Sequence, residues 1–145
     1  MKAAKVTLSG LTGTSLMTLF SYLVSESKDR NFKEPERLAE LMERLSPVID
    51  KKTALPAGWT AHYGMGMAWA FVHAFLFRKG VKPNLKNTFI LGALSGAAGV
   101  LIWKLTFKLH PNPPRIHFNR YAGHLILAHM IYTIGTALID RSDKV

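Results

Sequence analysis

Four long segments without a charged residue limit what this chain can fold into. They cover residues 6–24, 57–77, 88–103 and 121–139. A helix needs roughly 20 mainly apolar residues to cross the ~30 Å hydrocarbon layer of a membrane. A chain of 145 residues has too little interior to bury four such helices on all sides in a soluble fold. The sequence therefore predicts an all-α integral membrane bundle in one domain, residues 1–145, with four transmembrane helices at about 5–25, 57–78, 87–107 and 120–139.

The charged residues are distributed as this topology requires. All nine acidic residues lie outside the four segments, because a charge at the centre of a membrane helix costs at least ~2.5 kcal/mol on insertion scales. The net charge of +10 then reflects Lys and Arg near anionic lipid headgroups. Because the basic residues are spread over every loop, the lipid bilayer is the predicted partner and nucleic acid is not. The absence of cysteine excludes disulfides, thiolate metal sites and dithiol oxidoreductases.

The first loop contains a separate helical pattern. Apolar side chains recur there at helical spacing, at Leu38, Leu41, Met42 and Leu45. With Pro35 in the first turn and Pro47 after the last, this pattern predicts an amphipathic helix at about residues 35–46. Its polar face is mixed and slightly acidic, unlike the basic face of a helix that binds a lipid surface. We expect it to pack over the end of the bundle, with docking of a membrane-protein partner as the alternative.

Glycines recur at helical spacing within the apolar segments. Gly92, Gly96 and Gly99 share one face of the third segment, and Gly66 begins a ridge of small residues in the second. Small residues four positions apart let helices approach closely in lipid. These four glycines are therefore predicted to be helix-packing residues, within one chain or between copies of it.

A proline-rich basic connector, residues 110–120, joins the last two segments. It holds three of the seven prolines and no acidic residue. Proline cannot continue a helix and holds the preceding residue in extended geometry, so the connector should be stiff and close an antiparallel helical pair. Arg115 and Arg120 are predicted to contact lipid phosphates, or else a bound anion.

Two short motifs carry a resemblance. The sequence HPNPPR follows the glycine-rich third segment, and GTSLMTLFSY lies in the first. With the overall plan, these motifs resemble a group of small four-helix bacterial inner-membrane proteins to which no activity is assigned. The resemblance implies a multi-pass protein of the bacterial inner membrane and carries over no functional residue.

The histidines are the residues most suited to chemistry. His62 and His124 each lie a few residues inside their segments, at matching depth in an antiparallel bundle. Imidazoles on facing helices can ligate a haem iron, so these two are the candidate haem pair, and His129 is the candidate that would join them at a metal site. The competing interpretations are histidines bonded to backbone, headgroups or neighbouring side chains, and histidines that bind a quinone or lipid headgroup.

Several functional classes are disfavoured by what the segments lack. They contain no carboxylate of the kind that proton-coupled multidrug transporters need, and the chain has no Ser–His–Asp or phosphate-transfer motif. The sequence therefore predicts a non-enzymatic integral membrane protein, such as an accessory subunit of a larger membrane complex. The alternative is a haem- or metal-binding protein for electron transfer or transport that uses histidines near one membrane face.

Overall fold

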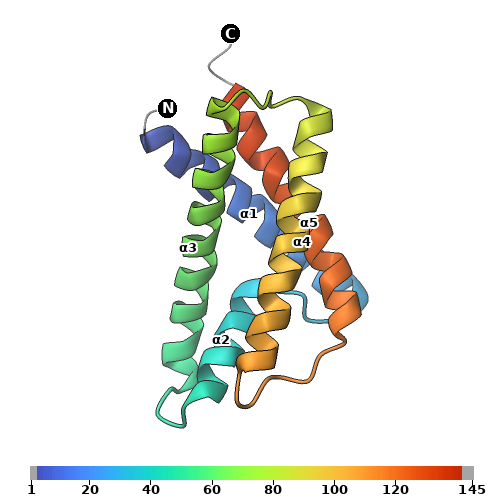
Figure 1. Ribbon diagram of the computed structural model, residues 1–145. Helices are drawn as coiled ribbons and strands as arrows, with labels where there is room; N and C mark the ends of the chain where they lie inside the picture. The colour runs from blue at the N-terminus through green and yellow to red at the C-terminus, as the bar shows by residue number, and fades with distance from the viewer. Residues whose placement is uncertain (1–2, 142–145) are drawn as a thin grey trace.

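The protein is all-α, and the computed structural model describes residues 3–141. Its helices are α1 (Ala3–Lys28), α2 (Glu34–Leu45), α3 (Lys51–Arg78), α4 (Leu85–Leu109) and α5 (Phe118–Arg141), with no strand in this part of the chain (Figure 1). The four long helices match the four apolar segments of the sequence. The short helix α2 matches the amphipathic pattern of the first loop.

The helix ends follow from local capping chemistry. The side chains of Asp50 and Asn84 accept backbone N–H groups at the starts of α3 and α4, from Thr53 and Asn87. The helix α3 begins at Lys51, six residues before the predicted span 57–78, and includes Pro56. Proline at this point removes only one backbone hydrogen bond, in the second turn of an exposed helix start, so it does not break the helix.

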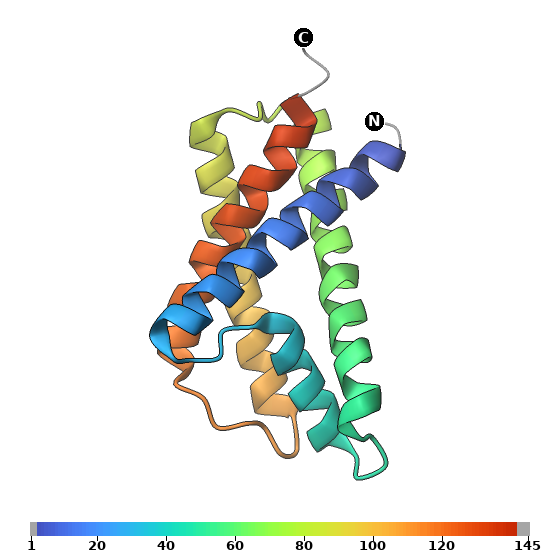
Figure 2. The same ribbon diagram turned by 180° about the vertical axis from the view of Figure 1, so that it is seen from behind.

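The helices pack as a tilted bundle with a short insert. The helix α1 crosses obliquely against α5 and α3, and α4 packs along α5. Because α1 ends about half-way along the bundle, α2 takes its place beside the first half of α3 (Figure 2). The expected position of α2 over the bundle end is therefore corrected: it forms part of the bundle wall. The helices α3 and α4 are not among the closely packed pairs.

The interior of the bundle contains many polar side chains. Hydroxyl and imidazole side chains fill it, among them Ser9, Thr14, Thr18, Ser21, Ser25, His62, His73, His124, His129, Thr133 and Thr136. A small apolar cluster surrounds Met17, Leu125 and Tyr132. Large apolar side chains instead cover the outside of all four long helices.

Two of the four long helices are long and apolar enough to cross a membrane by length and composition. These are α4 and α5, and they correspond to the predicted spans 87–107 and 120–139. The helices α1 and α3 do not pass the same criterion. In α1 the reason lies in its buried face, where Ser9, Thr14, Thr18 and Ser21 lower the mean hydropathy.

The glycine ridge of α4 lies against α5. A Cβ atom added at Gly92 would be 2.7 Å from the Cα of Met130, and one added at Gly96 would be 2.7 Å from the Cα of Ile126. Both distances are shorter than a side-chain carbon can tolerate against backbone. The two helices approach this closely because neither position carries a side chain.

Candidate ligand-binding cavity

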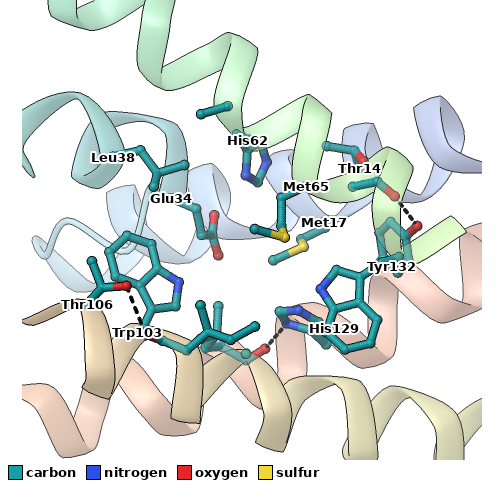
Figure 3. A pocket seen from close by; sticks show the side chains of 16 residues that line it. Thr14, Met17, Glu34, Leu38, His62, Met65, Trp103, Thr106, His129 and Tyr132 are labelled. Carbon is teal, nitrogen blue, oxygen red and sulfur yellow. Dashed lines mark hydrogen bonds between the residues drawn. The ribbon is translucent and has the colours of Figure 1, made fainter. Parts of the chain in front are cut away.

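A cavity of about 180 Å³ lies inside the bundle between α3 and α4. Most of its lining is apolar, from residues such as Met17, Met65, Ile102 and Leu125. All five helices contribute polar groups to the lining, among them Thr14 of α1, Glu34 of α2, His62 of α3, Thr106 of α4 and His129 of α5 (Figure 3). Apolar walls with a few convergent polar groups are typical of small-molecule sites between the helices of a bundle.

Glu34 is the most unusual residue of the cavity. It is the first residue of α2, only 2% of it is exposed, and its carboxyl group points toward the cavity. Ser21 donates a hydrogen bond of 2.8 Å to Oε1, whereas Oε2 is buried without a partner. Burial raises the pKa of this carboxyl group from 4.5 to about 8, against the opposing effect of the Ser21 hydrogen bond. The side chain is therefore a neutral carboxylic acid at pH 7.

Glu34 brings a carboxyl group into the bundle interior, although the four apolar segments contain none. In the sequence Glu34 belongs to the charged first loop. However, it lies four residues before Leu38 and seven before Leu41, on the apolar face of α2. That spacing is the signal that could have placed it inward. The exclusion of proton-linked transport, which depended on the missing carboxylate, no longer holds.

His62 and His129 line the cavity, and each commits one ring nitrogen to a hydrogen bond. The hydroxyl of Thr18 donates to the Thr14 carbonyl at 2.7 Å, so it accepts from His62 Nε2 at 2.8 Å. The carbonyl of Leu125 can only accept, so Nδ1 of His129, at 2.9 Å, donates to it. In the neutral rings, Nδ1 of His62 and Nε2 of His129 then remain as acceptors.

His124 lies beside the cavity without lining it. Its ring stacks on Phe20 and Phe32, with centroid distances of 5.3 and 4.5 Å. The Ser21 hydroxyl donates to Glu34, so it accepts from His124 Nε2 at 2.9 Å. The hydroxyl thus lies between the imidazole and the carboxyl group. A hydrolytic triad needs the imidazole in the middle, so these three residues are not arranged for nucleophilic catalysis.

The residues singled out from the sequence are therefore divided between several places. The cavity includes His62 and His129, together with Gly66 and Gly99, whereas the proposed haem partner His124 is turned toward α1 and α2. Within residues 3–141, no group of three or more His, Asp or Glu side chains could hold a metal ion. The haem and metal assignments of His62, His124 and His129 stay predictions.

The connector contacts α2 through its first histidine. The backbone N–H of Asn112 donates to Nδ1 of His110, so Nε2 of that ring donates to the Leu41 carbonyl at 2.8 Å. Arg115 and Arg120 are both exposed. Their predicted contact with lipid phosphate or an anion stays a prediction.

Two further cavity residues were not predicted from the sequence. Trp69 of α3 and Trp103 of α4 both line the cavity. No pattern in the sequence singles out either residue. In the comparisons with known proteins, no family model, curated protein or solved structure matches this chain.

Proposed function

We propose that this chain is a non-enzymatic integral membrane protein of the bacterial inner membrane, with α1, α3, α4 and α5 as spans, and that it holds a small molecule in the cavity between α3 and α4. The observation that carries the binding role is the unpartnered Oε2 of Glu34, buried at the wall of a preformed cavity. An unsatisfied buried polar group costs about 1–3 kcal/mol, more if charged, and a ligand that binds it recovers that cost. The hydroxyl of Thr14, also in the lining, is buried without a partner too.

Helix length and surface composition support the membrane assignment. Each of the four long helices has at least 24 residues, which corresponds to about 36 Å at 1.5 Å per residue. This length exceeds the ~30 Å of a hydrocarbon layer. Soluble monomers rarely expose large contiguous apolar surface, whereas a lipid-facing surface must be apolar.

The two helices that fall short of the hydropathy criterion fit the same assignment once their faces are separated. Large apolar residues are exposed on α1 at Leu8, Leu11, Leu19 and Leu23. On α3 they are exposed at Met65, Phe71, Val72 and Phe75. Several polar residues of the two helices are buried in the interior, and Thr18 of α1 and His62 of α3 form a hydrogen bond there. Helices of this kind have a moderate mean hydropathy and can still present apolar side chains to lipid.

The membrane assignment is tested by fractionation of cells that express the chain. We expect the protein in the membrane pellet after a wash in alkaline carbonate, and in solution only after detergent is added. Release by carbonate alone would contradict the proposal. Binding of haem, the alternative from the sequence, is tested on the same purified sample: a Soret band together with stoichiometric iron would replace the proposed function by that alternative.

A further inference from the structure

The polar groups of the cavity include an acid, two imidazoles that each keep one acceptor nitrogen, the hydroxyl groups of Thr14 and Thr106, and the indole N–H groups of Trp69 and Trp103. Nε2 of His129 and Nδ1 of His62 are acceptors, because the other nitrogen of each ring carries the hydrogen. Oε2 of Glu34 becomes a further acceptor when the carboxyl group loses its proton. No Lys or Arg is part of the lining. Once Glu34 ionises, a ligand that brings several N–H donors and a positive charge is the chemical complement of the carboxylate and the two imidazole acceptors, whereas an anion would be repelled by the carboxylate.

Two indole rings add to this preference. Trp69 and Trp103 line the cavity from α3 and α4, and Trp103 lies across the cavity from His129 in Figure 3. The face of an indole ring attracts cations, by about 2 kcal/mol or more where water is excluded. The cavity therefore combines an acidic group with aromatic walls.

The cavity wall is apolar on the outer side of the bundle, between α3 and α4. Met65 and Ile102 line the cavity and are 49% and 44% exposed. Both helices carry large apolar residues around these positions. In the proposed membrane orientation this side faces the acyl chains, so a ligand with an apolar tail could place its polar end inside and its tail in lipid.

We propose that the cavity binds the primary ammonium group of a molecule with an apolar tail, and that Glu34 is its counter-ion. This inference rests on the proposed function and names the ligand class for the same cavity. The three N–H donors of the ammonium group match the carboxylate and the two imidazole acceptors. The amine of a lipid headgroup and a free alkylamine share this chemistry.

Binding should release a proton. In the empty cavity Glu34 is a neutral acid, so an R–NH3⁺ ligand that pairs with the carboxylate displaces one H⁺ into water and charge is conserved. Other titratable groups face Glu34: His124 and Tyr121 from α5, His62 across the cavity from α3, and Tyr22 from α1.

The charges on α2 itself are engaged elsewhere. Lys33 pairs with Glu26 and Glu36, and Arg37 pairs with Glu40. Protonation of His62, His124 or His129 at acidic pH would repel a cation and so weaken its binding. Protonation of Glu34 at acidic pH weakens binding of the cation in the same direction. A variant that removes only the carboxyl group is therefore needed to separate the two contributions.

The test uses the full chain purified in detergent micelles, with hexylammonium as the probe. Binding is followed by the fluorescence of Trp69 and Trp103 and by calorimetry in two buffers that differ in ionisation enthalpy, with protein-free micelles as the blank. We expect saturable binding, release of close to one proton at pH 7, and at least about tenfold weaker binding of hexanol, hexanoate and hexyltrimethylammonium. Between pH 6 and 7.5 the affinity should rise by about tenfold per pH unit.

The variant Glu34→Gln keeps the shape of the side chain and removes its charge. It should bind hexylammonium at least about tenfold more weakly and release no proton, whereas Glu43→Gln, on the exposed face of the same helix, should match the wild type. Equal binding by Glu34→Gln, or equal binding of hexanol by the wild type, would overturn the ammonium assignment. If no probe binds, the proposed binding function fails as well, whereas carbonate extraction still decides the membrane assignment independently.

The source of the ammonium group is distinguished in lipid nanodiscs. If the headgroup of phosphatidylethanolamine occupies the site, hexylammonium should bind several-fold more weakly in discs of that lipid than in discs of phosphatidylcholine. Equal affinity in the two kinds of disc would assign the site to a free amine.

Discussion

At the scale of single residues, the interior is organised by hydroxyl groups of α1. Thr18 connects to His62 of α3, and Ser21 connects to His124 of α5 and to Glu34 of α2. One face of one helix thereby binds three other helices through side-chain hydrogen bonds. In an interior with few large apolar residues, these bonds are what makes the packing specific, because each buried polar group has a particular partner.

Two threonines one turn apart should respond oppositely to removal of the hydroxyl. Thr18→Val removes the partner of His62 Nε2 and leaves a buried N–H unsatisfied, so the free energy of unfolding should fall by about 1–3 kcal/mol. Thr14→Val removes a hydroxyl that is already without a partner, so stability should be unchanged or higher. Thermal unfolding in detergent, read by circular dichroism, measures both. Equal losses would show that the Thr18–His62 bond is not formed.

The buried carboxyl group of Glu34 predicts a pH dependence of stability with a definite sign. The pKa of Glu34 is about 8 in the folded protein, against an ordinary value of 4.5 for an exposed glutamic acid. Between pH 4.5 and pH 8 the folded state therefore holds one more proton than the unfolded state. Stability should therefore fall as pH rises, by about 1.4 kcal/mol per pH unit, and level off above pH 8.

This dependence is tested by measuring the melting temperature between pH 7 and 9. The range is chosen because histidines with ordinary pKa values titrate below it. Glu34→Gln has no proton to lose and should give a flat profile over the same range. A wild-type profile that is equally flat would mean that water or a charged partner reaches the carboxyl group.

At the scale of elements, the sequence was informative about helices and less so about their contacts. The segments without charged residues placed the four long helices, and the apolar periodicity placed α2, within a few residues, except at the start of α3, which lies six residues before the predicted span. The contribution of Glu34 to the cavity was missed because it depends on the tilt of α1, which makes room for α2 in the bundle wall. A tilt arises from packing of several helices together and leaves no pattern in any one of them.

The candidate site was predictable to a similar degree. His62 and His129 were singled out because histidine is uncommon in apolar segments. Their pairing in one cavity, and the exclusion of His124 from it, depends on side-chain directions around α5. Those directions follow from helical geometry once the neighbours are known, since residues 124 and 129 are about 140° apart on a helix. Trp69 and Trp103 both line the cavity because α3 and α4 do not pack closely against each other, which leaves space between the two helices.

The close contact of α4 with α5 can be tested with two glycines. Gly96→Ala places a methyl group 2.7 Å from the Cα of Ile126, which α5 can only relieve by moving away. We expect a loss of about 1–3 kcal/mol of stability. Gly64→Ala is the control, because nothing lies within 4 Å of its added methyl group and alanine favours a helix by about 1 kcal/mol. A stabilising Gly96→Ala would mean that the two helices are farther apart.

At the scale of the whole molecule, the buried polar side chains and the exposed apolar side chains of the long helices are two parts of one arrangement. Buried hydroxyl groups and imidazoles give the bundle specific contacts where lipid provides no hydrophobic driving force between helices. The same polar interior leaves room for a cavity with an acid in its wall. In this arrangement α2 has two roles, because it completes the wall beside α3 and carries Glu34 to the cavity. In the proposed arrangement all four long helices cross the membrane, which distinguishes it from one in which only α4 and α5 span.

The number of spans can be decided by cysteine labelling, since the chain has no cysteine of its own. Single cysteines are introduced at exposed positions in three connections: Val48→Cys before α3, Lys82→Cys before α4 and Asn112→Cys before α5. An impermeant maleimide is then applied to spheroplasts. If α3 and α4 both span, positions 48 and 112 lie on one side and position 82 on the other, so 48 and 112 should react alike and 82 oppositely.

The alternatives give different labelling patterns. If only α4 and α5 span, position 48 lies on the same side as position 82 and should react like it. A fourth variant, Ala4→Cys near the start of α1, extends the test: it should react like position 82 if α1 spans and like position 48 if it does not. Labelling after permeabilisation, in which all four cysteines should react, controls for accessibility. Each helix that spans moves the following connection to the other side. Agreement of 4 with 82 and of 48 with 112, together with opposite reactions at 48 and 82, therefore requires α1, α3 and α4 all to cross the membrane.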